Sequence, residues 1–197
     1  EYLCNNFIYA ANRIPEIADD VYAIDNAMRW GFGWDQGPIE TWDLLGVAES
    51  VAKMEAEGRT VPAWVKQMLD AGRTSFYARD GEGRLTMWKN GAAVPVPRSE
   101  GHLFLSDVKA KGKPAIERNP SATLLDLGDG VLGLEFHSKM NSLDDLIFST
   151  YEKALDKLDA GEFEALVVGN QAGNAFDAGA NVLMILMAAM QKDWASI

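Results

Sequence analysis

Cysteine and histidine are scarce in this sequence, which has one cysteine and two histidines among 197 residues. A single cysteine excludes an internal disulfide and cannot by itself build a zinc site, so we expect a metal-free protein of the reducing cytoplasm. No basic neighbour in the sequence would activate the thiol of Cys4, which we expect to be a small core or helix residue. His102 and His137 have no carboxylate or second histidine at ligand spacing, and we predict no catalytic or metal-binding role for them.

Positive charge and long apolar runs are also in short supply. Lysine and arginine total 18 against 29 acidic residues, giving a net charge of -11. A sequence-independent nucleic-acid binder needs a basic stripe to displace counterions, so that class is excluded. The apolar run Val182–Met190 is roughly half of the ~20 residues that a membrane span requires, and it predicts a buried helix face.

The two ends of the sequence suggest a piece of a longer polypeptide. The N-terminus lacks the basic-then-apolar order of a signal peptide. The sequence starts without a methionine and stops at Ile197, inside a helix-like run with no capping signal. We therefore expect a fragment of a larger protein.

Residues 1–78 have the apolar spacing of short helices joined by short loops, which predicts an all-α bundle. Apolar residues recur at three- and four-residue steps from Phe7 to Val21. Pro15 interrupts this run, so either one helix ends near Arg13 or a second begins with Pro15 in its first turn. The further predicted helices are Ala23–Trp30 with Gly31 as its C-cap, Ile39–Leu45, Val47–Glu57 and Val61–Ala71.

Residues 79–120 are expected to connect two domains. Asp-Gly and Asn-Gly pairs between Phe76 and Pro97 favour short strands with tight turns, although an irregular loop is the alternative. Arg98–Pro120 mixes glycine, proline and lysine, which is typical of a linker, here with one helical turn.

Residues 121–197 follow an α/β pattern, in the order ββαβα. The stretch Gly169 to Ile185 connects the last strand to the last helix, and backbone N–H groups of such a loop can point at a ligand oxygen. The predicted elements are a hairpin of Thr123–Leu127 and Val131–Phe136, a helix capped by Asn141 or Ser142 and running to about Leu158, a strand Ala165–Val168, and a helix from Asn181.

The first domain resembles the C-terminal helical domain of 3-hydroxyacyl-CoA dehydrogenases. The similarity lies in V-Y-A-I-D-N-A-M-R-W-G-F-G-W-D-Q-G-P-I-E-T-W-D-L-L-G. In that family the pattern is I-D-x-A-hydrophobic-x-x-G-x-x-x-G-P-hydrophobic-x-x-x-D-x-hydrophobic-G. The matching residues are Asp25, Gly31, Gly37, Pro38, Asp43 and Gly46, and the tryptophans within the stretch (Trp30, Trp34 and Trp42) are expected to be buried in the core rather than stacked on a nucleotide.

That resemblance implies NAD as the cofactor, bound by a domain outside this sequence. The family also contributes a catalytic asparagine in a Gly-Phe-x-x-Asn-Arg motif, which makes Asn12 a candidate. The match is incomplete, because Phe7 lies two residues too far upstream and no glycine precedes it. The sequence of residues 30–40 more closely resembles the second copy of this domain in multifunctional β-oxidation proteins. That copy is mainly a scaffold.

The second domain resembles the crotonase, or enoyl-CoA hydratase/isomerase, superfamily. The two similar stretches are L-D-L-G-D-G-V-L-G-L-E-F-H-S-K-M-N-S-L and A-L-V-V-G-N-Q-A-G-N-A-F-D-A-G-A-N-V. The similarity covers Ser121 to about Met190, roughly the first third of such a domain. Crotonases hold the thioester carbonyl of an acyl-CoA between two backbone N–H groups, which stabilise the developing enolate.

This resemblance implies a set of site residues. The backbone N–H of Ala180, after Ala178 and Gly179, is expected to be one half of the oxyanion hole. The second donor and the two glutamates of hydratases would lie beyond Ile197. Asn181 replaces the usual aspartate, and the residues at the CoA-binding positions are Lys139 and Met140, for which a solvated lysine and a core methionine are the alternative.

The order of the two resemblances implies part of a fatty-acid β-oxidation enzyme acting on acyl-CoA thioesters, a 3-hydroxyacyl-CoA dehydrogenase joined to an enoyl-CoA hydratase. The isolated fragment is expected to be inactive and to self-associate through the apolar helix Val182–Met190. The alternative is a non-catalytic scaffold or interaction module. The expected partners are acyl-CoA and the rest of the parent polypeptide.

Overall fold

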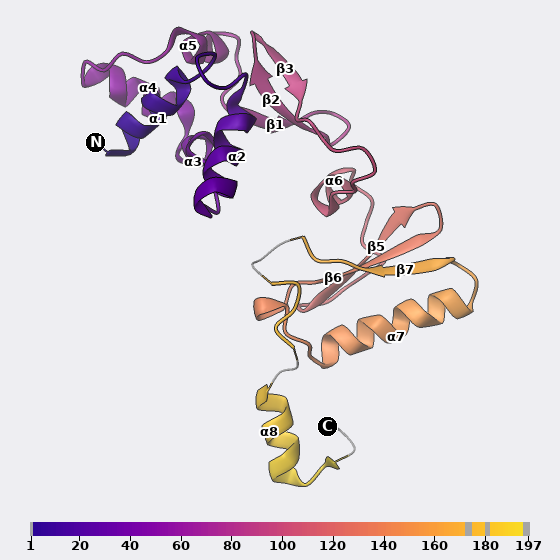
Figure 1. The fold of residues 1–197 in the computed structure, drawn as a ribbon. Coiled ribbons are helices and arrows are strands. Elements are labelled where there is room, and N and C mark those ends of the chain that lie inside the picture. Colours follow the sequence, from indigo (N-terminus) through magenta and orange to yellow (C-terminus); the bar gives the residue numbers. More distant parts are fainter. Residues whose placement is uncertain (1, 172–174, 180–181, 195–197) are drawn as a thin grey trace. The chain divides into compact units, whose positions relative to one another are not determined.

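The computed structural model describes residues 2–171, 175–179 and 182–194. The chain forms two compact units, Glu1–His102 and Leu103–Ile197, each with its own hydrophobic core (Figure 1). Each unit is considered by itself below.

The first unit contains five helices and a small sheet. The sheet is antiparallel in the order β1-β2-β3, with Tyr77 opposite Met87 and Trp88 opposite Ala93. The elements are α1 (Tyr2–Asn12), α2 (Val21–Phe32), α3 (Pro38–Leu45), α4 (Val47–Ala56), α5 (Ala63–Asp70), β1 (Tyr77–Arg79), β2 (Leu85–Lys89) and β3 (Ala92–Pro95).

Local chemistry sets most of the helix ends. The end of α1 at Asn12 confirms the first of the two alternatives for the Pro15 region, since turns and not a second helix follow. Pro38 occupies the first turn of α3, where its missing N–H costs nothing. Gly31 was the wrong C-cap for α2, because the helix continues to Phe32 and ends at Gly33, which has the left-handed φ of 67°.

An aromatic stack fills the centre of the first unit. The Trp42 ring lies parallel to Phe7 at 5.2 Å between centroids, and 5.2 Å from Phe76 on its other side. Trp42 is therefore buried as predicted. The same prediction was wrong for Trp30 and Trp34, which are 78% and 40% exposed at the end of α2 and in the loop after it.

The three strands belong to the same core as the helices. Met87 and Trp88 of β2 and Val96 after β3 are buried in one cluster with the aromatic stack. The first unit is thus α+β, and the expected all-α bundle ending at residue 78 was wrong. The strands were predicted, but short strands give no sequence signal of the core against which they pack.

A buried aspartate ties the helices to the sheet. Asp25 of α2 is 1% exposed, and its Oδ1 accepts the Ile39 N–H at 2.8 Å, at the start of α3. Its Oδ2 accepts the Tyr77 hydroxyl of β1 at 2.7 Å. The close approach requires glycine at position 37, since a Cβ there would lie 2.1 Å from Asp25 Oδ1 and 2.4 Å from Asp25 Cα.

A second aspartate makes a parallel link. Asp43 of α3 accepts the Phe76 N–H at 2.7 Å through one carboxylate oxygen and the Tyr77 N–H at 2.8 Å through the other. Both oxygens thus satisfy backbone donors at the start of β1, which would otherwise lack partners.

The second unit is an α/β arrangement around a four-stranded sheet in the order β4-β5-β6-β7. The first three strands are antiparallel neighbours, and β7 runs parallel to β6. The elements are α6 (Leu105–Ala110), β4 (Glu117–Arg118), β5 (Ala122–Gly128), β6 (Val131–Phe136), the 3₁₀ turn η1 (Lys139–Asn141), α7 (Asp145–Asp159), β7 (Ala165–Val168) and α8 (Val182–Gln191).

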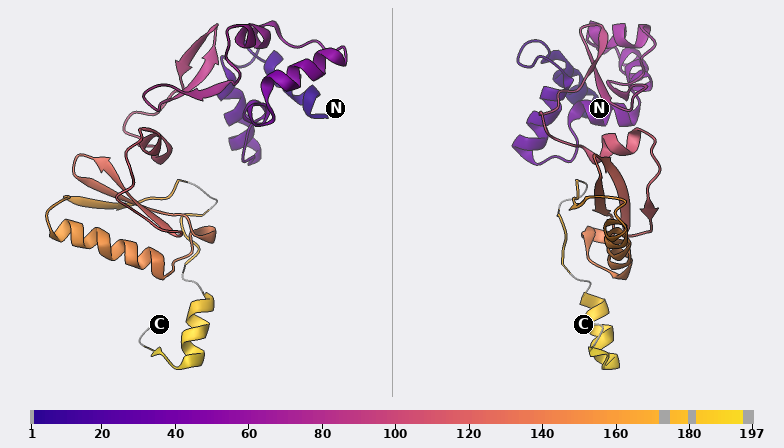
Figure 2. Two further views of the ribbon diagram at one scale, coloured as in Figure 1. Left: turned by 180° about the vertical axis from the view of Figure 1, so that it is seen from behind. Right: turned by 90° about the vertical axis from the view of Figure 1, so that its right-hand side faces the viewer.

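Helix α7 lies along one face of this sheet, as Figures 1 and 2 show. Its Ile147 and Ala154 are buried against Leu124, Leu132 and Leu134 of the strands. The buried stripe of α7 is narrow, because larger apolar residues of the helix are exposed, namely Leu146, Tyr151 and Leu155.

The N-cap of α7 is Asp144, so the prediction of Asn141 or Ser142 was wrong. Asp144 Oδ1 accepts the Ile147 N–H at 3.0 Å, and Oδ2 accepts the Ser121 hydroxyl at 2.6 Å. The side chains of Asn141 and Ser142 instead bond the chain that follows β7. The helix therefore begins two or three residues later than expected.

Helix α8 presents much apolar surface. Val182, Leu183 and Met190 are 75%, 62% and 77% exposed. Within the described residues, no helix combines the length and apolar character that crossing a membrane demands. The predicted buried face of this helix is not buried by the described part of the chain.

Substituting Gly37 tests the close approach of α2 and α3. Gly37→Ala should destabilise the first unit by about 3 kcal/mol or more, because both a carboxylate and backbone atoms must move. The matched control is Gly31→Ala, whose Cβ meets no atom within 4 Å inside helix α2 and should stabilise by about 0.5–1 kcal/mol. Urea unfolding followed by tryptophan fluorescence measures both, since every tryptophan except Trp194 lies in this unit. Equal stability of the two variants would contradict the assignment.

Amide replacements distinguish the two aspartates. Asp43→Asn should destabilise by about 2 kcal/mol at pH 7, since its NH₂ group would face a backbone N–H donor. Asp25→Asn should cost less, because its amide oxygen can still accept the Ile39 N–H while the Tyr77 hydroxyl rotates to accept from the new NH₂. Urea unfolding of both variants checks the order, and the reverse order would refute this description.

Candidate functional site

Two segments of the second unit that are far apart in sequence lie side by side where the crotonase-like site was predicted. One is the connection from β6 to α7, and the other is residues 175–179 before α8 (Figure 1). Asn141 Nδ2 donates to the Ala175 carbonyl at 2.9 Å. The Gly179 carbonyl accepts the Leu143 N–H at 2.9 Å and the Ser142 hydroxyl at 3.1 Å.

Asn170, just after β7, secures the same segment from the other side. Its Oδ1 accepts the Phe136 N–H at 2.7 Å, and its Nδ2 donates to the Phe176 carbonyl at 2.5 Å. The segment is thus held through three of its carbonyl groups. An ordered main chain of this kind can present N–H groups to a ligand oxygen without reorganising.

Lys139 and Met140 lie at this junction in the 3₁₀ turn, and both side chains are exposed. Met140 is 67% exposed, so it is not part of the core formed by the described residues of this unit. Met140 and Asn141 both have left-handed backbone angles, with φ of 58° and 55°. Such angles are uncommon outside glycine and concentrate at functional sites.

Ala178 and Gly179 complete the described part of the predicted site. Ala178 is exposed, and Gly179 has a φ of 78°. The Gly179 N–H donates to Asp177 Oδ1 at 2.6 Å, so it is already occupied. The predicted oxyanion donor Ala180 and the helix-starting Asn181 lie outside the described residues.

Polar contacts between α6 and the sheet were missed by sequence reasoning. Gln171 accepts the Leu105 N–H and donates to the Leu103 carbonyl, both at 2.7 Å. Lys109 of α6 pairs with Glu135 of β6, which is 4% exposed. The acidic residue inside an apolar strand was the available signal, because a buried carboxylate needs a partner.

The two histidines show no sign of catalytic pairing. His137 contacts the Thr123 hydroxyl at 2.8 Å and the Pro120 carbonyl at 3.0 Å, both neutral groups. Among the described residues, no cluster of three or more histidine, cysteine or acidic side chains could hold a metal ion.

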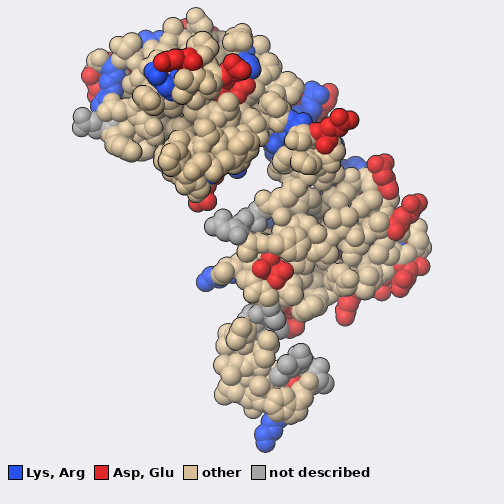
Figure 3. Space-filling view, in the orientation of Figure 1, with Lys and Arg blue, Asp and Glu red and all other residues tan. Residues whose placement is uncertain are grey.

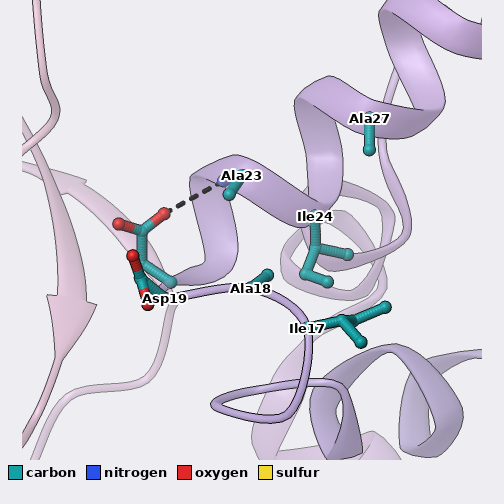
Figure 4. Close-up of a pocket in the computed structure, with 7 residues that line it drawn as sticks. Ile17, Ala18, Asp19, Ala23, Ile24 and Ala27 are labelled. Carbon is teal, nitrogen blue, oxygen red and sulfur yellow. Dashed lines mark hydrogen bonds between the residues drawn. The ribbon is translucent and has the colours of Figure 1, made fainter.

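Asn12, the candidate catalytic asparagine, is the last residue of α1 and is exposed. It does not line the hollow of about 350 Å³ beside the start of α2 (Figure 4). Ile17, Ala23 and Ile24 form much of that hollow, and Asp20 at its edge caps α2 by accepting the Ala23 N–H. The catalytic role of Asn12 stays a prediction.

Charge on the second unit does not suggest a polyanion site. Figure 3 shows carboxylates spread across its visible face, with no basic stripe there.

The strongest electrostatic perturbations lie in the first unit. Burial raises the pKa of Asp25 to about 7, although the bonds from Tyr77 and Ile39 partly oppose the shift. Burial likewise raises the pKa of Asp43 to about 6. The pKa of Tyr77 is also raised, by burial and then by the adjacent Asp25 carboxylate. Perturbed groups often mark active sites, but these three bond one another and the backbone within the core. Their role is structural.

The Asp25 titration predicts a pH-dependent stability. With a folded pKa near 7 and an ordinary value of 3.8, the folded state binds the proton more tightly, so the stabilisation is complete below pH 3.8 and is lost as pH rises through 7. The unfolding free energy of wild type minus that of Asp25→Asn should fall between pH 4 and 7 by at most about 1.4 kcal/mol per pH unit. Urea unfolding across that range measures it, and a constant difference would contradict the titration.

Comparison with known proteins shows one extended similarity. The chain is 42% identical over 180 residues to the probable 3-hydroxyacyl-CoA dehydrogenase of Bacillus subtilis (strain 168). The aligned residues cover 91% of this chain and 22% of that protein. An alignment of this length is longer than either compact unit, so it includes parts of both.

A more distant relative is the putative fatty acid oxidation complex trifunctional enzyme of Rickettsia felis (strain ATCC VR-1525 / URRWXCal2), 24% identical over 197 residues, which cover 94% of this chain. No family model matches the chain. No solved structure matches it either. The chain spans 22% of the length of each of these two relatives, and is similar to a segment of proteins named for 3-hydroxyacyl-CoA dehydrogenation and fatty acid oxidation.

Proposed function

We propose that this chain is part of a fatty-acid β-oxidation enzyme that acts on acyl-CoA thioesters. The observation that carries the proposal is the 42% identity to a 3-hydroxyacyl-CoA dehydrogenase through both compact units. The two units thus have counterparts in the same order in one relative. An alignment confined to one unit would not show that both units occur together in one relative.

In this proposal the first unit is the helical domain of the dehydrogenase. Asp25, Gly37 and Asp43 match the pattern of that domain, and they are the residues that join α2, α3 and β1. The matching residues are therefore explained by folding and not by catalysis. This supports a scaffold role for the unit, with NAD and the hydride transfer belonging to a domain outside this chain.

The second unit is proposed to be the first part of a crotonase-type hydratase domain. Its strands, its helix α7 and the segment before α8 follow the order expected from the resemblance. Lys139, Met140 and Ala178 are exposed around one junction, where they would contact the CoA thioester. Backbone N–H groups from residue 180 onward would supply the stabilisation of the enolate.

Helix α8 is proposed to contact the rest of the parent polypeptide. Its exposed apolar side chains exceed what isolated surface residues would explain, especially Val182, Leu186 and Met190. Without that cover, the isolated chain should self-associate through α8, which sedimentation analysis measures, and a clean monomer would count against this role.

Assays on the full-length polypeptide test the proposed activity. We expect hydration of crotonyl-CoA and reduction of acetoacetyl-CoA with NADH, whereas the isolated 197 residues should show neither, because the remaining catalytic groups lie elsewhere. The absence of both activities from the full-length polypeptide would remove the proposal. Reduction without hydration would remove only the hydratase assignment.

A further inference from the structure

The Gly179 carbonyl accepts two hydrogen bonds from the connection between β6 and α7, which is distant in sequence. Leu143 donates its backbone N–H at 2.9 Å, and Ser142 donates its hydroxyl at 3.1 Å. The backbone of Ser142 is extended, with φ of -64° and ψ of 133°, which any residue with a Cβ adopts readily. The serine is therefore not required by its backbone conformation.

Asn141 makes a further hydrogen bond to residues 175–179, near the start of that segment. Its side chain is buried and donates to the Ala175 carbonyl at 2.9 Å, four residues before Gly179. Its φ of 55° is a conformation that asparagine tolerates better than most residues. Asn141 thus serves both the turn and the neighbouring segment.

The hydrogen bonds on the Gly179 carbonyl matter for the proposed reaction because of the geometry of the peptide bond. A carbonyl oxygen and the following N–H group belong to one planar unit and point in opposite directions when the bond is trans. Two bonds on the Gly179 oxygen fix the direction of the carbonyl at the end of residues 175–179. The N–H group that follows is the oxyanion donor implied by the resemblance, on a residue outside the described part of the chain.

We propose that Asn141 and Ser142 are positioning residues for the acyl-thioester site. They hold residues 175–179 against the turn that contains Lys139 and Met140, and they fix the Gly179 carbonyl at the end of that segment. Neither side chain needs to touch the substrate. This inference rests on the proposed function, since it assigns the two residues to the hydratase reaction.

Variants of Ser142 in the full-length polypeptide test the proposal. Ser142→Ala removes one of the two donors and should lower kcat for crotonyl-CoA hydration about 10-fold or more, with KM within twofold, since small misplacements of catalytic groups are costly. Ser142→Thr retains the hydroxyl and should restore most of the rate. Ser149→Ala, an exposed serine of α7, is the matched control and should behave as wild type.

Asn141→Asp gives an independent variant. It keeps a residue suited to the left-handed backbone but replaces the N–H donor with an oxygen facing the Ala175 carbonyl. We expect a loss in kcat of about 10-fold or more. NADH-dependent reduction of acetoacetyl-CoA by the same polypeptide should stay unchanged in every variant, and so should the thermal midpoint of Ser142→Ala within about 2 °C.

The outcomes separate this inference from the function on which it rests. An inactive wild type in the hydration assay would overturn both. An active wild type with Ser142→Ala and Asn141→Asp at wild-type kcat would overturn this inference alone. A loss that Ser142→Thr does not restore, accompanied by a lowered thermal midpoint, would also overturn it by showing a purely structural role.

Discussion

The carboxylate of Asp25 is the interaction on which the first unit depends. It joins three elements by accepting one backbone N–H at the start of α3 and one hydroxyl from β1. Because this contact leaves no room for a Cβ at position 37, the glycine and the aspartate require each other. Asp43 of α3 makes a similar link to the start of β1, so this strand is held by one acidic side chain from each of α2 and α3.

The raised pKa values of these groups show what this arrangement costs. Burial of a carboxylate is unfavourable, and the hydrogen bonds offset it only in part. The bonds from Asp25 and Asp43 both reach the start of β1, a strand of three residues, and so they fix where this strand meets α2 and α3. Asp25, Gly37 and Asp43, which match the dehydrogenase pattern, therefore hold the elements of the first unit together.

The second unit uses neutral side chains for a comparable purpose. Asn141, Ser142 and Asn170 hold the carbonyl groups of residues 175–179, and they leave the exposed side of the junction to Lys139 and Met140. A main-chain site for a thioester oxygen needs such support, since its donors cannot be adjusted by side-chain rotamers. In the function proposed above, the first unit is a scaffold and the second unit shapes a segment for binding the thioester.

The sequence predicted those features that local chemistry determines. Pro38 and Gly46 mark the ends of α3, and the Gly128–Gly130 turn marks the hairpin, because each needs only its neighbours in the chain. The partner of Asp25 could not be predicted in this way, since Tyr77 lies 52 residues away.

Two kinds of feature were not predicted from the sequence. They are the burial of individual side chains and the choice among several possible N-cap residues. Trp30 and Trp42 are the same residue type in consecutive helices, yet Trp42 is buried and Trp30 is exposed. The difference depends on which face of its helix each residue occupies. Asn141, Ser142 and Asp144 can all cap a helix, and the first two bond residues 175–179 instead. The sequence did not predict the hydrogen bonds that support residues 175–179, and the binding roles of Lys139, Met140 and Ala178 stay predictions.

Hydrogen–deuterium exchange of the full-length polypeptide with and without a saturated acyl-CoA, which cannot be hydrated, tests the central claim most directly. The account predicts slower exchange in peptides covering residues 138–143 and 175–180 when the thioester binds. It predicts no change in residues 21–45, where the matched residues serve folding. Unchanged exchange in both segments of the second unit under saturating acyl-CoA would contradict the account.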